Sequence, residues 1–259
     1  MDRWHMVSPL SLKSPAKINL TLDIVSRRED GYHELVSLVC PIGLYDEVCL
    51  SPATRLEVVC HYPGVPGDET NLAYRAARLF LDRIDRGGAF RIDLTKRIPV
   101  GAGLGGGSGN AATVLVGLNR LYGEPLTQDA LVIMGGQLGA DVPFFVLCRP
   151  VVAMGIGERL AAVGGLPQRW AVVVYPGFGI STRQAYEGLC RNVSDPNLAL
   201  TKSENLHKSL LLKVRNGPPE CYLSNDLEAA MLPRHPALAE AKRALVQNGA
   251  LGALMTGSG

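Results

Sequence analysis

The sequence has few of the features that mark nucleic-acid-binding, membrane-spanning or secreted proteins. Charged residues make up only 19% of its 259 residues and the formal net charge is +2, so a broad basic surface for nucleic acid or anionic lipid is not expected. No apolar run approaches the roughly 20 residues of a membrane-spanning helix. Residues 1–13 are polar and lack the apolar stretch of a signal peptide. These absences predict a cytoplasmic protein that has neither nucleic acid nor a membrane as its partner.

The six cysteines are too scattered to indicate a zinc site or a redox pair. None of them forms a Cys-x-x-Cys motif. Structural disulfides are not expected in a chain that is predicted to be cytoplasmic. We therefore expect buried, chemically inert cysteines and no resident metal.

The hydrophobic residues, 47% of the chain, follow both strand-like and helix-like patterns. Alternating or continuous apolar runs predict strands at 16–21, 35–40, 56–62, 90–95, 170–175 and 251–255. Helical spacing and capping residues predict helices that begin near Asn71, after a glycine-rich segment, at Thr127 and at Pro236. The mixture predicts an α+β protein of two lobes with a boundary near residues 150–165.

Three segments of the second half carry more specific expectations. Residues 170–175 are continuously apolar and predict a fully buried strand. The polar stretch 191–220 is expected to form helical fragments and loop. Asn225 and Glu228 have the spacing of a capping box, which predicts a helix that begins there.

A glycine-rich segment is the most informative feature of the chain. Six of the 29 glycines lie between residues 101 and 109. Glycines let several backbone N–H groups approach phosphate oxygens and allow positive φ angles. The helix expected to open near Ser108 adds unpaired N–H groups and a positive dipole end. The segment therefore predicts a site for a triphosphate.

Other interpretations of this segment fit the sequence less well. Lys96 and Arg97 stand where a dinucleotide-binding loop would have a buried strand, and no acid closes a second strand about 20 residues on. The Gly-Lys-Ser/Thr ending of a Walker loop is absent. A flexible linker would rarely run straight into an alanine- and leucine-rich helix.

Residues 99–112, which read Pro-x-x-x-Gly-Leu-Gly-Gly-Gly-Ser-x-Asn-Ala-Ala, resemble the phosphate loop of the GHMP kinases. The three-glycine form is similar to the branch whose substrate carries a cytidine diphosphate group, in the non-mevalonate route to isoprenoid precursors. The resemblance implies ATP with Mg²⁺ as co-substrate. It also implies that the ATP-binding residues are Asn71, Pro99, Val100, Gly101, Ala102, Gly103, Leu104, Gly105, Gly106, Gly107, Ser108 and Gly109.

Gly109 is a departure from the family, which commonly has a second serine at this position. If that serine contacts magnesium in relatives, water or Ser108 has to substitute here. We expect Gly109→Ser to be tolerated unless the glycine is required for its backbone conformation.

Lys17 and Asp141 are the candidate catalytic residues. From the residues alone, Lys17 could be a solvated strand lysine that shares a face with Asn19, and Asp141 could be the cap of a turn. The segment Ser-Pro-Ala-Lys-Ile-Asn-Leu around Lys17 is similar to the first GHMP motif. The resemblance implies a catalytic pair in which Lys17 keeps Asp141 ionised and offsets transition-state charge. Asp141 would either orient or deprotonate the substrate hydroxyl.

The segment Asp-Gly-Tyr-His, at 30–33, is similar to a signature of the same branch. The resemblance implies that Tyr32 stacks on a pyrimidine ring and that His33 hydrogen-bonds its edge, although a packed tyrosine and a surface histidine are the commoner situations. A second aromatic ring, Tyr186, would form the other side of the stack. The expected substrate-binding residues are Asn19, Tyr32, His33, Thr182 and Tyr186.

The resemblance runs from Ser14 to the last residue, Gly259. It implies a two-lobed GHMP kinase fold, with a ribosomal-protein-S5-like ATP-binding domain at 1–155 and a ferredoxin-like domain at 156–259. Residues 256–259 are similar to a third glycine motif after which relatives continue, so we expect the second domain to be incomplete at its end. Another GHMP kinase, of the homoserine or mevalonate type, and a non-catalytic nucleotide-binding module are the alternatives. The sequence predicts no particular oligomeric state.

Overall fold

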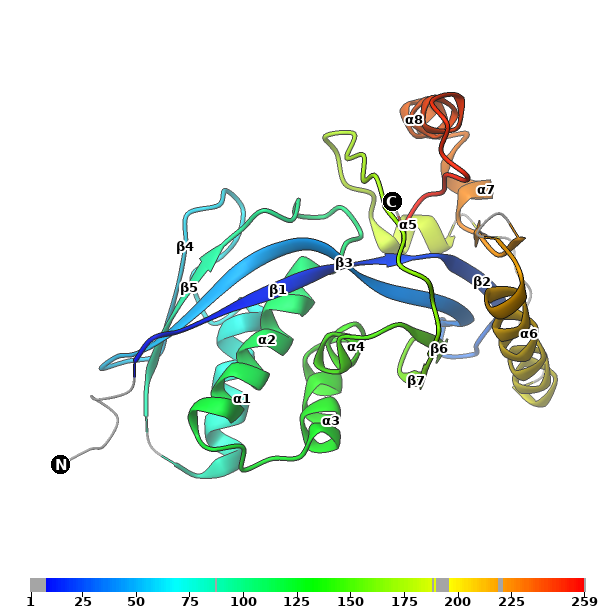
Figure 1. Cartoon of the computed structure of the whole chain (residues 1–259). Helices are drawn as coiled ribbons and strands as arrows, with labels where there is room; N and C mark the ends of the chain where they lie inside the picture. The colour runs from blue at the N-terminus through cyan, green and yellow to red at the C-terminus, as the bar shows by residue number, and fades with distance from the viewer. Residues whose placement is uncertain (1–7, 87, 188, 190–195, 219–220, 259) are drawn as a thin grey trace. The chain divides into compact units, whose positions relative to one another are not determined.

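The computed structural model describes residues 8–86, 88–187, 189, 196–218 and 221–258 (Figure 1). No helix in these ranges has both the length and the apolar character that crossing a membrane requires. The described residues form two compact units. The first contains those of Met1–Ala16, Pro41–Val100 and Gly105–Cys148, and the second those of Lys17–Cys40, Gly101–Leu104 and Arg149–Gly259. The domain boundary near residue 155 stays a prediction.

The first unit places helices against one face of a sheet (Figure 1). Its strands are β1 (Leu10–Asn19), β3 (His33–Pro52), β4 (Glu57–Cys60) and β5 (Phe90–Thr95), of which β1 and β3 continue into the second unit. β5 pairs antiparallel with the second half of β3 and parallel with β4. The helices are α1 (Leu72–Ile84), α2 (Gly106–Leu121), α3 (Gln128–Leu138) and α4 (Val142–Leu147).

Local signals account for where α1 and α3 begin. The Asn71 side chain accepts a hydrogen bond from the Ala73 N–H, and Thr127 does the same for Ala130, as the sequence predicts. The strand predicted at 90–95 is β5, and its alternating residues Phe90, Ile92 and Leu94 are buried. These elements confirm the predictions that rested on short-range patterns.

Helix α2 lies unusually close to the sheet. A methyl group at Gly117 would come within 2.6 Å of Leu50 Cδ1 and 2.8 Å of Leu12 Cδ1. At Gly109 it would come within 2.9 Å of the Pro15 carbonyl oxygen and 3.0 Å of Ser14 Oγ. A side chain at Gly109 would therefore displace the backbone of β1. The expectation that serine is tolerated there is wrong, and the reason is close packing rather than a positive φ angle.

A buried polar network joins the sheet to the start of α2. The Asp46 side chain is fully buried and forms an ion pair with Lys96, whose side chain is 4% exposed. Asp46 also accepts hydrogen bonds from the N–H groups of Arg97 (2.7 Å) and Ile98 (2.9 Å). Asn110 on α2 donates to Asp46 and accepts from Lys96, each at 3.0 Å. The network fixes the segment that precedes the glycine loop, because each buried charge has several partners.

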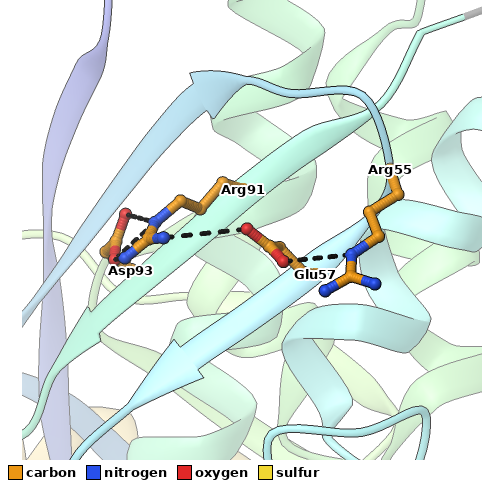
Figure 2. Close-up of polar contacts among 4 residues, drawn as sticks. All are labelled: Arg55, Glu57, Arg91 and Asp93. Atoms are coloured by element: carbon orange, nitrogen blue, oxygen red, sulfur yellow. Dashed lines mark hydrogen bonds and ion pairs between the residues drawn. The ribbon is translucent and has the colours of Figure 1, made fainter.

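Exposed ion pairs on β4 and β5 make a useful contrast (Figure 2). Arg91 contacts Asp93 at 2.8 Å and Glu57 on the neighbouring strand at 3.7 Å, and Arg55 contacts Glu57 at 3.3 Å. Solvent and salt screen pairs of this kind, so they contribute little to stability.

The second unit contains the rest of the same sheet, including the end of β1, and has helices on both of its faces. Its strands follow the order β8 (Ser224–Asn225), β2 (Thr21–Arg27), first half of β3, β6 (Val151–Gly155), β7 (Arg159–Ala162), and only the β8–β2 pair is parallel. The helices are α5 (Thr182–Glu187), α6 (Pro196–Asn216), α7 (Glu228–Met231) and α8 (Pro236–Gln247). α8 begins and ends where the sequence predicts.

The two faces of this sheet carry separate apolar clusters, because successive strand residues point to opposite sides. Val36 and Leu38 pack with Leu210 and Val214 of α6. Leu35, which immediately precedes Val36 in β3, packs on the other face with residues of α5 and α7. The sheet is thus covered on both sides.

Three predictions for the second half are wrong. Residues 170–175 form no strand and are exposed, with Trp170 fully accessible, because no neighbouring strand in the described ranges satisfies their backbone. Residues 251–255 form no strand either. The described part of 191–220 contains a single helix of 21 residues, α6, rather than fragments. Its apolar residues Leu206, Leu210 and Val214 are spaced by four, a pattern diluted by the polar residues between them.

The cysteine prediction is only partly correct. The described cysteines are free, but Cys148, at the end of α4, and Cys221 are exposed, and the others are half-buried. Burial raises the pKa of Cys40 to about 12 and also raises that of Cys148, so both thiols stay protonated at neutral pH. Cys190 lies outside the described residues.

The buried ion pair of Asp46 and Lys96 should contribute far more to the free energy of unfolding than the exposed ion pairs of Arg55, Glu57, Arg91 and Asp93. Asp46→Asn leaves the Lys96 ammonium buried without its counter-charge, and breaking a buried pair in this way costs about 3–5 kcal/mol. We expect a lower urea midpoint with an unchanged slope. The matched control is Asp93→Asn, which removes an exposed pair partner and should leave the midpoint nearly unchanged. Equal losses in both variants would contradict a structural role for the network.

Candidate active site

Lys17 and Asn19 are held together at the end of β1. Both side chains are buried, at 6% and 7% exposure, so the half-solvated strand that the alternation predicts is covered on its polar face as well. The Lys17 ammonium donates to Asn19 Oδ1 at 2.7 Å. Asn19 Nδ2 donates to Ser37 Oγ at 2.8 Å, and Ser37 Oγ donates to the Thr21 carbonyl at 2.5 Å. Ser37 thereby fixes the amide so that its oxygen faces Lys17.

A turn from the end of the described chain meets the same side chains. We call residues 255–258 the terminal turn. Thr256 Oγ1 accepts a hydrogen bond from the Asn19 N–H at 2.9 Å. A methyl group at Gly257 would lie 3.5 Å from Lys17 Nζ and 3.4 Å from the Gly103 carbonyl oxygen. Gly257 thus leaves space beside the Lys17 ammonium that any larger residue would fill, and its φ of +60° also favours glycine.

Residues 101–104 of the glycine segment belong to this unit. The Leu104 carbonyl accepts from the Lys17 N–H at 3.0 Å. Gly101 and Gly103 have φ angles of +75° and +68°, which glycine adopts without strain. Ala102 and Leu104, which follow these two glycines, are buried, whereas Val100 is 44% exposed and Pro99 half-buried. This half of the segment supports Lys17 directly.

Residues 105–109 belong to the first unit, where they start α2. The helix begins at Gly106, two residues before Ser108, and its N-cap Gly105 has φ +71° and provides no side-chain cap. The N–H groups of Gly106, Gly107 and Ser108 consequently have no intrahelical partners. A helix start of this kind is suited to binding an anion such as a phosphate.

Asp141 lies in the first unit as the N-cap residue of α4. The turn predicted around it is the beginning of this helix, with Pro143 in its first turn. Asp141 is exposed, whereas Val142 and Phe144 behind it are buried. The helix positions the carboxylate on the surface of the unit, and its pairing with Lys17 of the second unit stays a prediction.

Asn71 is engaged by local structure. Its oxygen caps α1 and its Nδ2 donates to the Pro66 carbonyl at 2.6 Å, and the residue is 8% exposed. A contact of this residue with ATP remains a prediction.

His33 and Tyr186 are brought together from distant parts of the chain. Their ring centroids are 5.1 Å apart and the planes are tilted by 39°. His33 Nε2 is buried without a hydrogen-bond partner among the described residues. Burial, together with the charge of Arg27, lowers the pKa of His33, so the ring is neutral at pH 7. Tyr32 is 60% exposed at the neighbouring turn.

Thr182 contacts the terminal turn rather than standing alone. Its Oγ1 lies 3.1 Å from Ser258 Oγ, although the residue itself is exposed. The structure therefore joins three predicted site residues of the second unit, Lys17, Asn19 and Thr182, through one short segment.

The capping box predicted for Asn225 and Glu228 is wrong. Helix α7 begins at Glu228 with Leu227 as its N-cap, so no capping box forms. Asn225 Nδ2 instead donates to the carbonyls of Met255 (2.6 Å) and Gly257 (2.9 Å), and Glu228 accepts from the Met255 N–H at 2.7 Å. Spacing alone cannot reveal these contacts, because the partners are about 30 residues away.

No group of three or more His, Cys, Asp or Glu side chains is arranged to hold a metal ion within the described ranges.

Comparisons with known proteins identify the family and the fold. Residues 71–149 match the GHMP kinases N terminal domain. The chain is 43% identical over 252 residues to the 4-diphosphocytidyl-2-C-methyl-D-erythritol kinase of Pelobacter propionicus, which covers 96% of this chain and 87% of that protein. A crystal structure of 4-(cytidine 5'-diphospho)-2C-methyl-D-erythritol kinase superposes with a TM-score of 0.79 at 38% identity, over 96% of this chain and 87% of that one.

A more distant neighbour supports the fold alone. The homoserine kinase from Cytophaga hutchinsonii superposes with a TM-score of 0.70 at 19% identity, over 100% of this chain and 85% of that one. The α+β architecture predicted from the sequence is confirmed as the GHMP kinase fold. Because the identity to the first relative extends over nearly its whole length, the chain belongs to the GHMP kinase family, in the group of 4-diphosphocytidyl-2-C-methyl-D-erythritol kinases.

Proposed function

We propose that the chain transfers the γ-phosphoryl group of ATP to the 2-hydroxyl of 4-diphosphocytidyl-2-C-methyl-D-erythritol, in the non-mevalonate route to isoprenoid precursors. The observation that carries the proposal is the 43% identity over 252 residues to a relative of that name. We expect this step to take place in the cytoplasm.

The geometry of the second unit supports a phosphoryl-transfer site. Phosphoryl transfer needs positioning and charge neutralisation more than covalent chemistry. The Lys17 ammonium is fixed by Asn19, and the missing side chain at Gly257 leaves its vicinity open. The unpaired N–H groups at the start of α2 offer a separate place for ATP phosphates.

In the proposed reaction the substrate hydroxyl oxygen bonds to the γ-phosphorus as the bond to the β,γ-bridging oxygen breaks. ADP leaves with the electron pair of that bond. The hydroxyl proton passes to the Asp141 carboxylate, which acts as the base. Lys17 offsets the negative charge on the oxygens of the transferred group.

ATP would enter as its Mg²⁺ complex. Mg²⁺ keeps several waters and takes few protein ligands besides the phosphates, whose charge it neutralises when bound. Gly109 has no hydroxyl and no room for one, so we propose Ser108 and water as the remaining ligands.

His33 and Tyr186 support a cytidine site. The neutral His33 Nε2 can accept a hydrogen bond from the cytosine amino group, which would satisfy a buried atom that lacks a partner. Tyr186 beside it and the exposed Tyr32 are the rings that we propose for stacking.

The protein should consume ATP with 4-diphosphocytidyl-2-C-methyl-D-erythritol and Mg²⁺ and should phosphorylate its 2-hydroxyl. The measurement is a coupled ADP assay, with the product identified by mass spectrometry and phosphorus NMR. Homoserine and mevalonate serve as alternative acceptors and should give no turnover above ATP hydrolysis. Comparable turnover of either acceptor would overturn the substrate assignment.

Asp141→Asn should lower kcat by ~10²–10⁴, the usual contribution of a general base, while the KM for ATP stays within about two-fold. The matched control is Asp129→Asn, an exposed acid in the first turn of α3. An unchanged kcat for Asp141→Asn would exclude this residue as the base.

Binding of the cytidine substrate should weaken at low pH because His33 then becomes charged. The pKa of His33 in the folded protein lies below the ordinary value of 6.5. The folded state therefore binds a proton on this ring less tightly than the unfolded state does. The contribution of His33 to stability is complete above pH 6.5 and is lost as the pH falls through its lowered pKa. Titration calorimetry without ATP should show that the Kd of the cytidine substrate rises as the pH falls through the lowered pKa of His33.

His33→Gln should abolish this pH dependence, whereas His61→Gln, on the exposed surface of the first unit, should retain it. A pH profile that His33→Gln leaves unchanged would show that another group titrates.

A further inference from the structure

The segment Ser-Asn-Asp-Leu-Glu at 224–228 is bound to the edge of β2 along its length. Ser224 and Asn225 pair in parallel with Thr21 and Leu22. Asp226 accepts a hydrogen bond from the Ile24 N–H at 2.9 Å and donates its own N–H to the Leu22 carbonyl at 2.9 Å. The segment is therefore anchored to the strand that follows Asn19.

From this anchor Asn225 holds the terminal turn. The Asn225 side chain is 7% exposed, and both its amide oxygen and its amide nitrogen form hydrogen bonds. Its Oδ1 accepts from the Leu227 N–H at 2.9 Å, which fixes the amide orientation. Both N–H bonds of Nδ2 then point to carbonyls of the turn, those of Met255 and Gly257. A carboxylate of the same shape could make the first contact and neither of the other two.

Glu228 adds a third contact to the same turn. Its Oε1 accepts from the Met255 N–H, and its Oε2 pairs with Lys242 of α8. Three hydrogen bonds thus fix the backbone N–H and carbonyl of Met255 and the carbonyl of Gly257. The terminal turn has no regular secondary structure of its own to hold it.

On its other side the terminal turn touches the proposed catalytic cluster. Thr256 accepts from the Asn19 N–H, Gly257 lies beside Lys17 Nζ, and Ser258 contacts Thr182. A shift of the turn would therefore move a hydrogen-bond partner of Asn19 and the wall beside Lys17. Small displacements of a charge-neutralising group lower the rate strongly in phosphoryl transfer.

We propose that Asn225 is a positioning residue for phosphoryl transfer, acting through the terminal turn on Lys17 and Asn19, with Glu228 as its auxiliary. The proposal rests on the proposed kinase function for its kinetic readout. Its structural content, that Asn225 determines the environment of Lys17, can be measured without any turnover.

The decisive variant is Asn225→Asp, which keeps the acceptor for Leu227 and replaces two donors by an oxygen that repels the carbonyls of the turn. We expect kcat to fall at least ten-fold while the KM for ATP changes less than about two-fold. The matched control is Asn248→Asp, which also removes an amide-to-carbonyl bond, from Asn248 Nδ2 to the Ala244 carbonyl at the exposed end of α8. Its kcat should equal that of the unaltered protein.

Glu228 provides a rescue test. Glu228→Gln keeps an oxygen for the Met255 N–H and loses only the ion pair with Lys242, whereas Glu228→Ala loses both contacts, so Glu228→Gln should retain a higher kcat than Glu228→Ala. Assays at a temperature well below the unfolding midpoint of every variant separate positioning from loss of folded protein.

The readout that needs no substrate is the acetylation rate of Lys17, followed by mass spectrometry with the exposed Lys208 as internal reference. Lys17 is buried, so Asn225→Asp should raise its relative rate at least three-fold while Asn248→Asp leaves it unchanged. If the unaltered protein shows no kinase activity, the proposed function fails and this rate alone decides the role of Asn225. Native kcat and a native Lys17 rate in Asn225→Asp, or an equal effect of Asn248→Asp, would overturn the proposal.

Discussion

Burying the ammonium group of Lys17 is the constraint on which the second unit depends. A buried ammonium is tolerated only with well-placed hydrogen-bond acceptors. Asn19 supplies one, but an amide can present either oxygen or nitrogen, so Ser37 has to fix its orientation. One positive charge lies away from water here. The Asn19 amide, the Ser37 hydroxyl on β3 and the terminal turn are the groups that surround it.

The glycines of the phosphate segment serve two different physical needs. Gly101, Gly103 and Gly105 adopt positive φ angles, so they shape the backbone. Gly109 has no such angle and is required because β1 passes too close for any side chain. The family's commoner serine therefore does not fit beside the neighbouring strand at this position.

Short-range sequence patterns correctly predicted the helices and strands whose formation depends on neighbouring residues in the chain. Asn71 and Thr127 cap helices with their own side chains, and 90–95 alternates because one face meets the core. The α+β class was predictable from the mixture of strand and helix patterns, and the GHMP kinase fold from the resemblance carried by the glycine segment. The use of Asn225 was not, because its partners are fixed only when the terminal turn packs beside it. The buried strand predicted at 170–175 failed for the opposite reason, because an apolar run becomes a strand only where a neighbouring strand pairs with it.

Residues 170–175 also have a consequence for how the protein behaves in concentrated solution. The six residues, Trp-Ala-Val-Val-Val-Tyr, carry no charge and no proline, and no strand among the described residues pairs with their backbone. Uncharged windows rich in β-branched and aromatic residues are the ones that stack between chains in cross-β assemblies. A single lysine in place of Val172, which is 73% exposed, would put a gatekeeping charge in this window without touching either apolar cluster.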